Sequence, residues 1–429
     1  MRSSRIAAIV ALLAGLSAAP AHAAGLADHI KAESERLFPA LVQARRWFHQ
    51  RPELSNREVE TAKEIARRLT AMGYQVQTGI ARTGVVAVLH GGLPGPVVAW
   101  RTDIDALPIE EQVAVPFRSQ NPGVMHACGH DVHMTVALGI AEVLMTLRPE
   151  VHGTVKFIFQ PAEEGPPAGE KGGASLMVEE GVLLNPAPAA IFGMHVMPTL
   201  PVGQVSVRAG GMLAASDEFT IKVHGLKSHG SAPHLGVDAV YVAAQLVVGL
   251  QEVVSRETDA RRPLVMSVGS LHSGNRFNII ADEAALEGTV RTLDEATHSS
   301  VRPAMQRVVD GICQAYRARC ELVYERSNPV TSNDPELAAF AAATLRTGLG
   351  ADKVVEAEPI MAAEDFAHYL QKVPGVFLFL GVRDPRKATA SYLHTPTFEP
   401  DESAILTGVR AGATLLTAYT ARQQSAGPH

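Results

Sequence analysis

Residues 125–133 place three histidines, one cysteine and one aspartate directly before a predicted helix. Thiolate and imidazole are the donors that zinc prefers in proteins. Cys128 and His130 are spaced so that both side chains can face one side of a loop. The segment therefore indicates a metal site. His126 or His133 could be the ligand instead, and for either one the alternative is a histidine that is hydrogen-bonded in the core.

Two pairs of acids could complete such a site. Asp103 and Asp105 are two residues apart in a segment expected to be extended, so their side chains face the same side. Glu163 and Glu164 follow an apolar run, and neighbouring side chains of an extended chain point in opposite directions. One glutamate could then bind a metal while the other acts on a water molecule, as a metal-dependent hydrolase requires. For both pairs the alternative is a solvated pair of acids.

Two isolated histidines, His195 and His394, add further nitrogen donors. Either one alone is more often structural, but the position of His195 after an apolar strand favours a functional role. Together, the candidates suffice for two metal ions with one bridging water. Carboxylate and thiolate donors would offset the charge of these cations.

The elements that must position these residues follow an α/β pattern. Helical spacing covers residues 28–72, with a break near Arg51 and Pro52 and a stop at Gly73. Helical segments are also expected at 133–147 and 174–180. Short apolar runs of the kind found in buried strands lie at residues 85–89, 97–100, 155–159, 189–192 and 376–380. This alternation predicts a sheet with helices on both faces and a site where the strands end.

The middle of the chain has a different order of elements. Strands are expected at 218–224, 264–271, 285–293 and 321–324, and helices at 238–257 and 299–316. The order βαββαβ is that of a ferredoxin-like unit. We therefore predict a catalytic domain at 24–210 and 327–429, interrupted by an inserted domain at 211–326.

Composition limits the class of protein. The 429 residues are 46% hydrophobic and 19% charged, which is typical of a globular chain, and the length favours two domains. The net charge of −6, without runs of Lys or Arg, makes nucleic acid a poor partner. Residues 1–23 contain Arg2, Arg5, an apolar run at 6–19 and the sequence Ala-His-Ala, a pattern typical of a secretory signal peptide.

The signal pattern predicts an exported protein, secreted into the bacterial periplasm. Its apolar run is shorter than the roughly 20 residues that span a bilayer, so no membrane span is expected. The cysteines are Cys128, Cys313 and Cys320, too few for a disulfide framework. Cys313 and Cys320 could pair only if the helix breaks between them, and we expect both to be packing residues instead.

Eight segments occur in an order that resembles the dinuclear-metal aminoacylase and carboxypeptidase family. Within it, the chain is most similar to the branch of hippurate hydrolases and plant auxin–amino-acid conjugate hydrolases. The resemblance covers nearly all of the chain after the signal. It implies a zinc-peptidase-like mixed sheet flanked by helices, with an inserted ferredoxin-like α+β lid domain that forms a dimer. The segments are residues 47–55, 101–108, 125–133, 159–165, 193–196, 228–234, 363–366 and 394–398.

The resemblance also implies roles for individual residues. It implies Glu163 as the general base, and it implies metal ligands at Cys128, His130, Glu164, His195 and His394. The wider family has His-x-Asp where this chain and its branch have Asp103-Ile104-Asp105. We therefore expect Asp103 and Asp105 to orient ligand imidazoles, with direct metal contact by Asp103 left open. Two divalent ions are implied, either zinc or manganese, cobalt or nickel.

The function expected is hydrolysis of the amide bond of N-acyl amino acids by metal-activated water. The resemblance implies that His229, from the lid of a partner subunit, supports the oxyanion. Asn275, Asn278 or Arg291 could hold the substrate carboxylate, although Arg291 could equally form a salt bridge within the lid. The alternatives are a carboxypeptidase or dipeptidase for short peptides, and a solute-binding protein without turnover.

Overall fold

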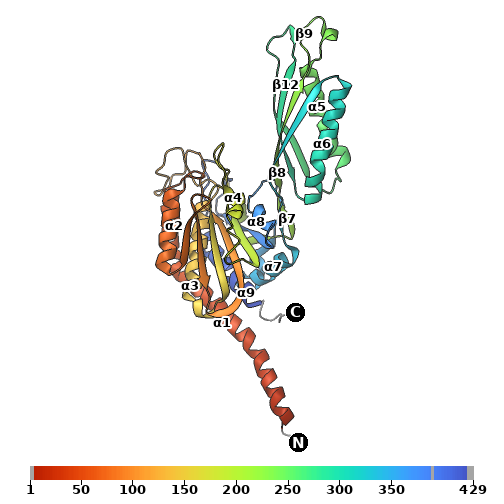
Figure 1. Ribbon diagram of the computed structural model, residues 1–429. Coiled ribbons are helices and arrows are strands. Elements are labelled where there is room, and N and C mark those ends of the chain that lie inside the picture. The colour runs from red at the N-terminus through yellow and green to blue at the C-terminus, as the bar shows by residue number, and fades with distance from the viewer. Residues whose placement is uncertain (1–3, 388–390, 423–429) are drawn as a thin grey trace. The chain divides into compact units, whose positions relative to one another are not determined.

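The computed structural model describes residues 4–387 and 391–422, with side chains from Gly25 onward. The chain forms two compact units (Figure 1). Unit 1 comprises Met1–Val207, Glu336–Ala357 and Lys372–His429, and unit 2 comprises Arg208–Pro335 and Glu358–Gln371. Unit 2 is thus larger than the insertion predicted at 211–326, because it extends to Pro335 and takes in a second segment further along the chain.

A mixed sheet forms the centre of unit 1. Strands β4, β3, β5 and β16 are parallel neighbours, β1 and β2 add antiparallel strands at one edge, and β6 pairs antiparallel with β16 at the other. This is the mixed sheet flanked by helices that the sequence predicts. The strands in spatial order are β1 (Gln75–Ile80), β2 (Gly84–His90), β4 (His152–Gln160), β3 (Leu93–Asp103), β5 (Ala190–Pro201), β16 (Gly375–Arg383), β6 (Val205–Val207) and β15 (Val354–Glu356).

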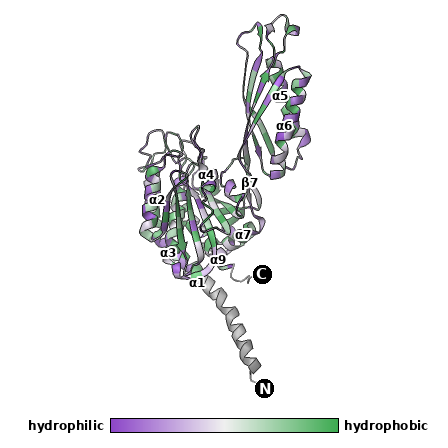
Figure 2. Cartoon of the chain, in the orientation of Figure 1, coloured by the Kyte–Doolittle hydropathy of each residue, from purple (hydrophilic) through white to green (hydrophobic). Residues whose placement is uncertain are grey.

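Helices α1, α3 and α9 pack against one another, and α3 and α9 also pack on β3. The two helices expected within residues 28–72 are α1 and α2, and α2 ends at Gly73, whose positive φ of 94° is favourable for glycine. In Figure 2 the strands of unit 1 are predominantly hydrophobic. The helices of unit 1 are α1 (Ser4–His49), α2 (Val59–Met72), α3 (His130–Thr146), α4 (Gly173–Glu179), α7 (Pro335–Leu349) and α9 (Ala404–Arg422), with short 3₁₀ turns at Arg148–Glu150 and Ala351–Lys353.

The predicted targeting segment overlaps the start of α1. Residues 1–3 lie outside the described residues, and from Ser4 to Ala24 only the backbone is described. A search of the described part of the chain finds no helix with the length and apolar character that crossing a bilayer requires. In the part described with side chains, α1 buries Leu37, Leu41 and Phe48 in the core.

Unit 2 contains the expected βαββαβ order. Its four-stranded sheet has the order β10-β12-β8-β13 with antiparallel neighbours, as a ferredoxin-like unit requires. The main elements are β8 (Ala215–His224), α5 (Ala239–Glu252), β10 (Leu264–Ser273), β12 (Glu283–Thr292), α6 (Glu295–Ala315) and β13 (Arg319–Asn328). Shorter elements are β7 (Gly210–Leu213), β9 (Ser228–His229), a 3₁₀ turn at Pro233–Leu235, a π-helical turn at Val253–Glu257, β11 (Ile279–Ile280), β14 (Thr331–Asn333) and α8 (Ala367–Leu370).

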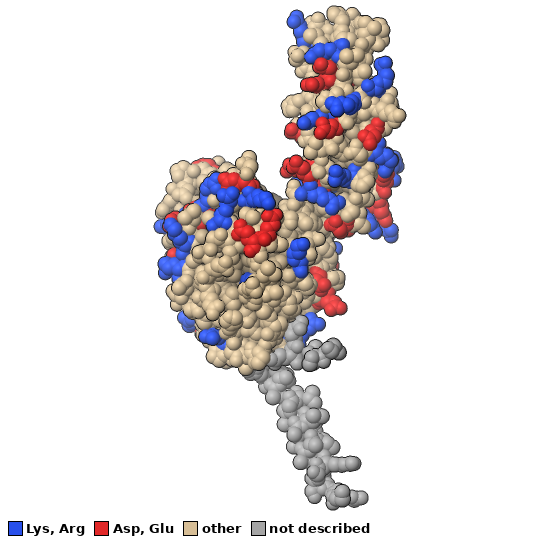
Figure 3. All heavy atoms as spheres, in the orientation of Figure 1, with Lys and Arg blue, Asp and Glu red and all other residues tan. Residues whose placement is uncertain are grey.

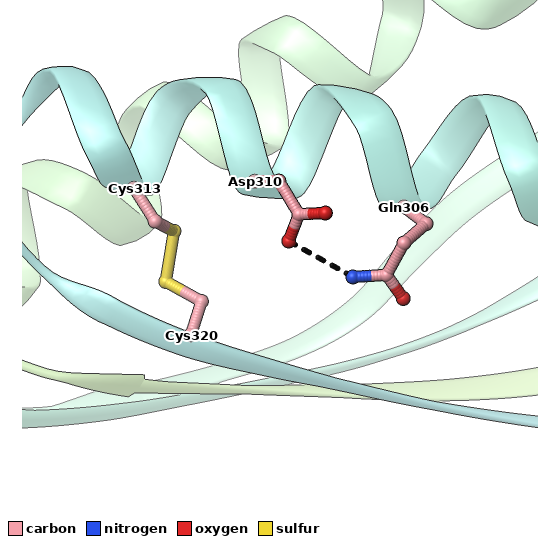
Figure 4. Close-up of a disulfide and its surroundings, with 4 residues drawn as sticks. All are labelled: Gln306, Asp310, Cys313 and Cys320. Carbon is pink, nitrogen blue, oxygen red and sulfur yellow. Dashed lines mark hydrogen bonds between the residues drawn. A yellow bond between two sulfur atoms is a disulfide. The ribbon is translucent and has the colours of Figure 1, made fainter.

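Cys313 and Cys320 form a disulfide, so the expectation that both are unpaired packing residues is wrong (Figure 4). Helix α6 ends at Ala315, and the chain turns at Arg317, whose φ is positive. The turn brings the two Cα atoms to 6.1 Å, within the range that a disulfide spans. The disulfide links α6 to β13, and the nearby Gln306 side chain donates a hydrogen bond to Asp310 on the same helix.

The surface charges of unit 2 are mixed. On the face drawn in Figure 3, basic and acidic side chains are interspersed over this unit. Several of them form ion pairs, among them Lys227 with Asp282 and Arg262 with Asp294. Such exposed pairs contribute little to stability, typically below about 1 kcal/mol each.

Candidate metal centre

Three adjacent parallel strands of unit 1 place polar residues at the same register across the sheet. Asp103, the last residue of β3, pairs with Gln160, the last residue of β4. On the other side of β3, Arg101 pairs with Gly193 of β5, which places His195 level with Asp103. β5 continues to Pro201, so His195 lies within the strand and not after its end, because residues 193–197 go on pairing with β16.

Helix α3 begins at His130, immediately after Gly129. Gly129 has a φ of 85°, and a Cβ placed there would lie 2.6 Å from a methyl group of Val196. Only glycine fits this close approach, which holds the start of α3 against β5. The Cys128 and His130 side chains on either side of Gly129 are both buried.

The donors proposed from the sequence converge in unit 1. Cys128 Sγ lies 3.3 Å from His195 Nε2 and 3.2 Å from His394 Nε2. His394 Nε2 lies 3.3 Å from Glu164 Oε1. His130 Nε2 lies 3.8 Å from a carboxylate oxygen of each of Glu163 and Glu164.

These donors form overlapping groups in which the ligand atoms all lie within 4.8 Å of one another. Cys128 and Glu164 each belong to two of the groups, and His130 belongs to three. Groups that share donors could hold two neighbouring ions. Three of the groups are Cys128 with His130 and His195, Cys128 with Glu164 and His394, and His130 with Glu163 and Glu164.

Glu163 and Glu164 converge on His130, contrary to the expectation that they point in opposite directions. That expectation assumed an extended chain. Instead, Ala162 has a φ of 54° and the two glutamates lie in a turn after β4. The left-handed residue reorients the backbone, so the alternation of a strand does not apply.

His133 has no nitrogen available for a metal. Its Nδ1–H donates to Asp103 at 2.6 Å, and its Nε2 accepts the backbone N–H of Val196 at 2.8 Å. The second Asp103 oxygen accepts from Arg101 at 2.9 Å. Asp103 is therefore bonded through both oxygens and holds His133, whose ring meets that of His195 edge to face with centroids 4.6 Å apart.

His126 lies in none of the donor groups found among the described residues. It is buried, neither ring nitrogen has a hydrogen-bond partner among the residues that the structure describes, and burial lowers the pKa of its ring to about 4. His133 does lie in a group with Asp103 and His130, but both of its ring nitrogens are already hydrogen-bonded, so neither alternative replaces His130.

Asp105 lies directly behind two of the donors. Its Oδ1 is 3.2 Å from His130 Nδ1, and its Oδ2 accepts the backbone N–H of Glu164 at 3.1 Å and the Ser55 hydroxyl at 2.7 Å. A carboxylate that holds the far nitrogen of a histidine leaves Nε2 to face a ligand. The contribution of Ser55 was not found from the sequence, where residues 47–55 counted only as part of a resemblance.

The charges around the cluster favour a cation. Burial opposes a charge on His130, but the carboxylates of Asp103, Asp105 and Glu164 raise the pKa of its ring to about 10. Burial, reinforced by the charges of Glu164 and Glu163, raises the pKa of the Cys128 thiol well above its usual range. A thiolate at this position therefore needs a cation beside it, and a bound metal ion would supply one.

The donor atoms themselves fit divalent ions. Burial lowers the pKa of His195, and its Nδ1–H donates to the carbonyl of Val196 at 2.7 Å, so the lone pair of Nε2 faces Cys128. Nε2 of His130 and Oε1 of Glu164 are buried and make no hydrogen bond within the described residues. Buried polar atoms of this kind are rare in proteins and call for a partner.

The four residues proposed from the sequence to contact the oxyanion or the substrate carboxylate belong to unit 2. His229 is exposed in β9, with Nδ1 2.7 Å from the Ser231 hydroxyl. Arg291, in β12, donates to the Thr289 hydroxyl at 2.6 Å, and burial lowers the pKa of its guanidinium. The side-chain oxygen of Asn278 is buried and makes no hydrogen bond to any described part of the chain. Asn275 lines an open hollow of about 560 Å³ beside β8 and β12.

A mixed α/β sheet with thiolate, imidazole and carboxylate donors beside its parallel strand ends defines a metal-dependent hydrolase. Residues 99–418 match the model of Peptidase family M20/M25/M40, and the chain belongs to this family. The resemblance stated from the sequence is thereby confirmed. The chain is a hydrolase of a family whose members act on amide bonds.

Similar proteins support this assignment. N-acetylcysteine deacetylase from Bacillus subtilis is 40% identical over 85% of this chain and 93% of its own length. IAA-amino acid hydrolase ILR1-like 4 from Arabidopsis thaliana is 37% identical over 90% of this chain and 87% of its own. The crystal structure of the YXEP protein of Bacillus subtilis, described as a dinuclear metal binding peptidase, is 37% identical, with a TM-score of 0.78 over 90% of this chain and 99% of that one.

Proposed function

We propose that the protein hydrolyses the amide bond of N-acyl amino acids. The observation that carries the proposal is the position of Glu163, whose carboxylate lies 3.8 Å from His130 Nε2 at the margin of the donor cluster. The names of two relatives, a deacetylase of N-acetylcysteine and a hydrolase of IAA-amino acids, support this substrate class. Both are described as cleaving an amino acid from a group attached to it.

In this proposal the metal ligands are Cys128, His130, Glu164, His195 and His394. When bound, divalent metal ions polarise the amide carbonyl and lower the pKa of a water molecule. Glu163 would take a proton from a water molecule as its oxygen bonds to the amide carbon, and would pass this proton to the nitrogen as the C–N bond breaks. Asp105 holds the His130 ring through Nδ1, and the Asp103–His133 pair holds the ring of His195 by packing beside it.

Substrate recognition is assigned to unit 2. We propose that the partner subunit's His229 donates to the developing oxyanion in a homodimer formed through the lid domain. The exposure of the His229 ring supports this role. Arg291, with Asn275 or Asn278, would bind the carboxylate of the amino acid, for which a guanidinium group is well shaped.

Export to the bacterial periplasm completes the proposal. The pattern of residues 1–23 supports it, since charged, apolar and Ala-x-Ala segments follow one another in the order of a secretory signal. The Cys313–Cys320 disulfide supports it independently, because disulfides persist in oxidising compartments.

The test is a substrate panel for the metal-loaded protein purified without its first 23 residues. Release of amine from hippurate, N-acetyl-amino acids and dipeptides is measured with and without a chelator, alongside elemental analysis. We expect release from N-acyl amino acids that the chelator abolishes. Release from dipeptides alone would instead identify a carboxypeptidase or dipeptidase, and no release from any substrate would favour a binding protein.

A further inference from the structure

Glu58 is an acid of unit 1 that is fully buried at the start of α2. Its Oε1 accepts the backbone N–H groups of Asn56 and Ala162, each at 2.9 Å. Its Oε2 accepts the Thr83 hydroxyl at 2.6 Å. Two of these three bonds reach other segments of the chain, so the buried carboxylate fixes those segments relative to the start of α2.

The bond to Ala162 is the one nearest to the donor cluster. Ala162 is buried and has a φ of 54°, a conformation that costs a residue with a Cβ of order 1 kcal/mol. The next two residues are Glu163 and Glu164, which converge on His130 only because the chain turns at Ala162. The group that holds the Ala162 N–H therefore influences where both carboxylates point.

The same short segment also supports the other side of the cluster. Ser55, three residues before Glu58, donates to Asp105, and the same oxygen of Asp105 accepts the Glu164 N–H. The loop between α1 and α2 thus contacts the Glu163–Glu164 turn once through Ala162 and once through Asp105. Neither Ser55 nor Glu58 belongs to the donor groups found among the described residues.

We propose that Glu58 is a positioning residue that sets the Glu163–Glu164 turn by accepting the N–H of Ala162. Its effect on turnover rests on the proposed function of Glu163. Its effect on the geometry of the metal ligands, through Glu164, does not depend on that function. Groups behind metal ligands typically change metal affinity or activity about 10- to 100-fold when they are removed.

Four variants separate the hydrogen bond from the bulk and the charge of Glu58. Glu58→Met keeps the length of the side chain and removes the acceptor. Glu58→Asp keeps an acid but shortens it by one methylene, so it cannot reach Ala162 and Thr83 together. Burial, reinforced by Asp105, raises the pKa of Glu58 to about 7, and Glu58→Gln, which resembles the protonated acid, keeps an acceptor for Ala162. Thr83→Val removes a different partner of the same carboxylate.

Each variant is compared with the wild type by kcat and KM on the best substrate of the panel, and by the visible spectrum of the Co²⁺-loaded protein. We expect Glu58→Met to lower kcat about 10- to 100-fold with KM within about threefold, and to change the Co²⁺ spectrum. Glu58→Asp should show a smaller change in the same direction. Glu58→Gln and Thr83→Val should keep kcat within about threefold and leave the spectrum unchanged.

Two results would overturn the proposal. One is a Glu58→Met protein with the kcat and Co²⁺ spectrum of the wild type, or the same result for Glu58→Asp where Glu58→Met does not fold. The other is a loss in Glu58→Gln as large as that in Glu58→Met, because the acceptor then is not what matters. If the wild type hydrolyses nothing in the panel, the proposed function fails, and the Co²⁺ spectra of the same variants still decide the role of Glu58.

Discussion

Each of the two units contains a buried histidine among carboxylates, but the two histidines differ in what their ring nitrogens contact. In unit 2, His298 Nε2 lies 2.7 Å from Asp217 and Nδ1 lies 3.3 Å from Glu295. Tyr324 also donates to the same Asp217 oxygen, at 2.6 Å. In unit 1, Asp105 lies 3.2 Å from His130 Nδ1, but His130 Nε2 makes no hydrogen bond within the described residues and faces Glu163 and Glu164, each at 3.8 Å.

This difference separates a structural cluster from a metal site. In the His298 cluster, both ring nitrogens and the Tyr324 hydroxyl have carboxylate partners, so these donors need no added group, although Asp217 Oδ1 makes no hydrogen bond within the described residues. The His130 cluster collects acceptors and a thiol that repel one another unless a cation lies between them. Histidine and acid occur in both places, so residue types alone do not define the site. The metal site is defined by a ring nitrogen without a hydrogen bond among the described residues, Nε2 of His130, and by the convergence of several donors.

The largest effect is expected at Glu163, the acid of the donor cluster that binds no metal in our proposal. Glu163→Gln removes the general base and keeps the shape of the side chain. We expect kcat to fall about 10²- to 10⁴-fold, the usual contribution of general acid–base catalysis, with metal content unchanged. Steady-state kinetics with elemental analysis measures both. Wild-type kcat in a metal-loaded Glu163→Gln protein would contradict the assignment.

The next largest effect is expected in metal affinity, which can be compared directly between variants of the two clusters. Cys128→Ala removes a donor shared by two of the ligand groups, so we expect metal affinity to fall more than the 10- to 100-fold typical of a supporting residue. The matched change in unit 2, His298→Gln, should leave the metal content at the wild-type value. Metal titration of both variants checks this. Equal losses in the two proteins would mean that the clusters do not differ as described.

Much of the fold could be predicted from the sequence, because apolar runs of strand length mark β2, β3, β4, β5 and β16. The order βαββαβ of unit 2 followed from the same reasoning, since each element is long enough to show its period. Short strands such as β6 and β15, with three residues each, lack a readable period and were missed. The edge strand β1 is mostly exposed, so it has no apolar run to identify it.

The site was harder to predict wherever a tertiary hydrogen bond or one dihedral angle decides the outcome. His133 could not be excluded as a ligand from the sequence, because its Nε2 is occupied by the N–H of Val196, 63 residues further along the chain. The convergence of Glu163 and Glu164 depends on the positive φ of Ala162, an alanine that carries no local signal for that conformation. The Cys313–Cys320 disulfide depends on the end of α6, and helix ends are the least certain part of any sequence-based assignment.

A third prediction concerns what stabilises each unit. Cys313→Ser with Cys320→Ser removes the disulfide of unit 2, which closes a short loop and contributes roughly 2–3 kcal/mol in the chain-entropy model. We expect faster amide hydrogen exchange in α6 and β13 and unchanged metal affinity in unit 1. A chelator should produce the reverse pattern, with faster exchange around α3. If the double variant instead loses metal, the two units are not independent in this respect.

The smallest effect is expected in the pH dependence of the free energy of unfolding of unit 2. This dependence tests whether the His298 cluster is structural. The hydrogen bond to Asp217 raises the pKa of His298, with burial opposing it, so the folded protein holds this proton more tightly than the unfolded chain. A raised pKa stabilises the folded state fully below the unfolded value of about 6.5, and this stabilisation is lost as the pH rises through the folded pKa. The free energy of unfolding of unit 2 should therefore fall above about pH 6.5 in the wild type, and His298→Gln should lack this slope. Urea unfolding from pH 6 to 9, with hydrogen exchange to localise it, measures the slope. The same slope in the variant would show that another group is responsible, and His298 would then no longer serve as the proton-sharing counterpart of His130.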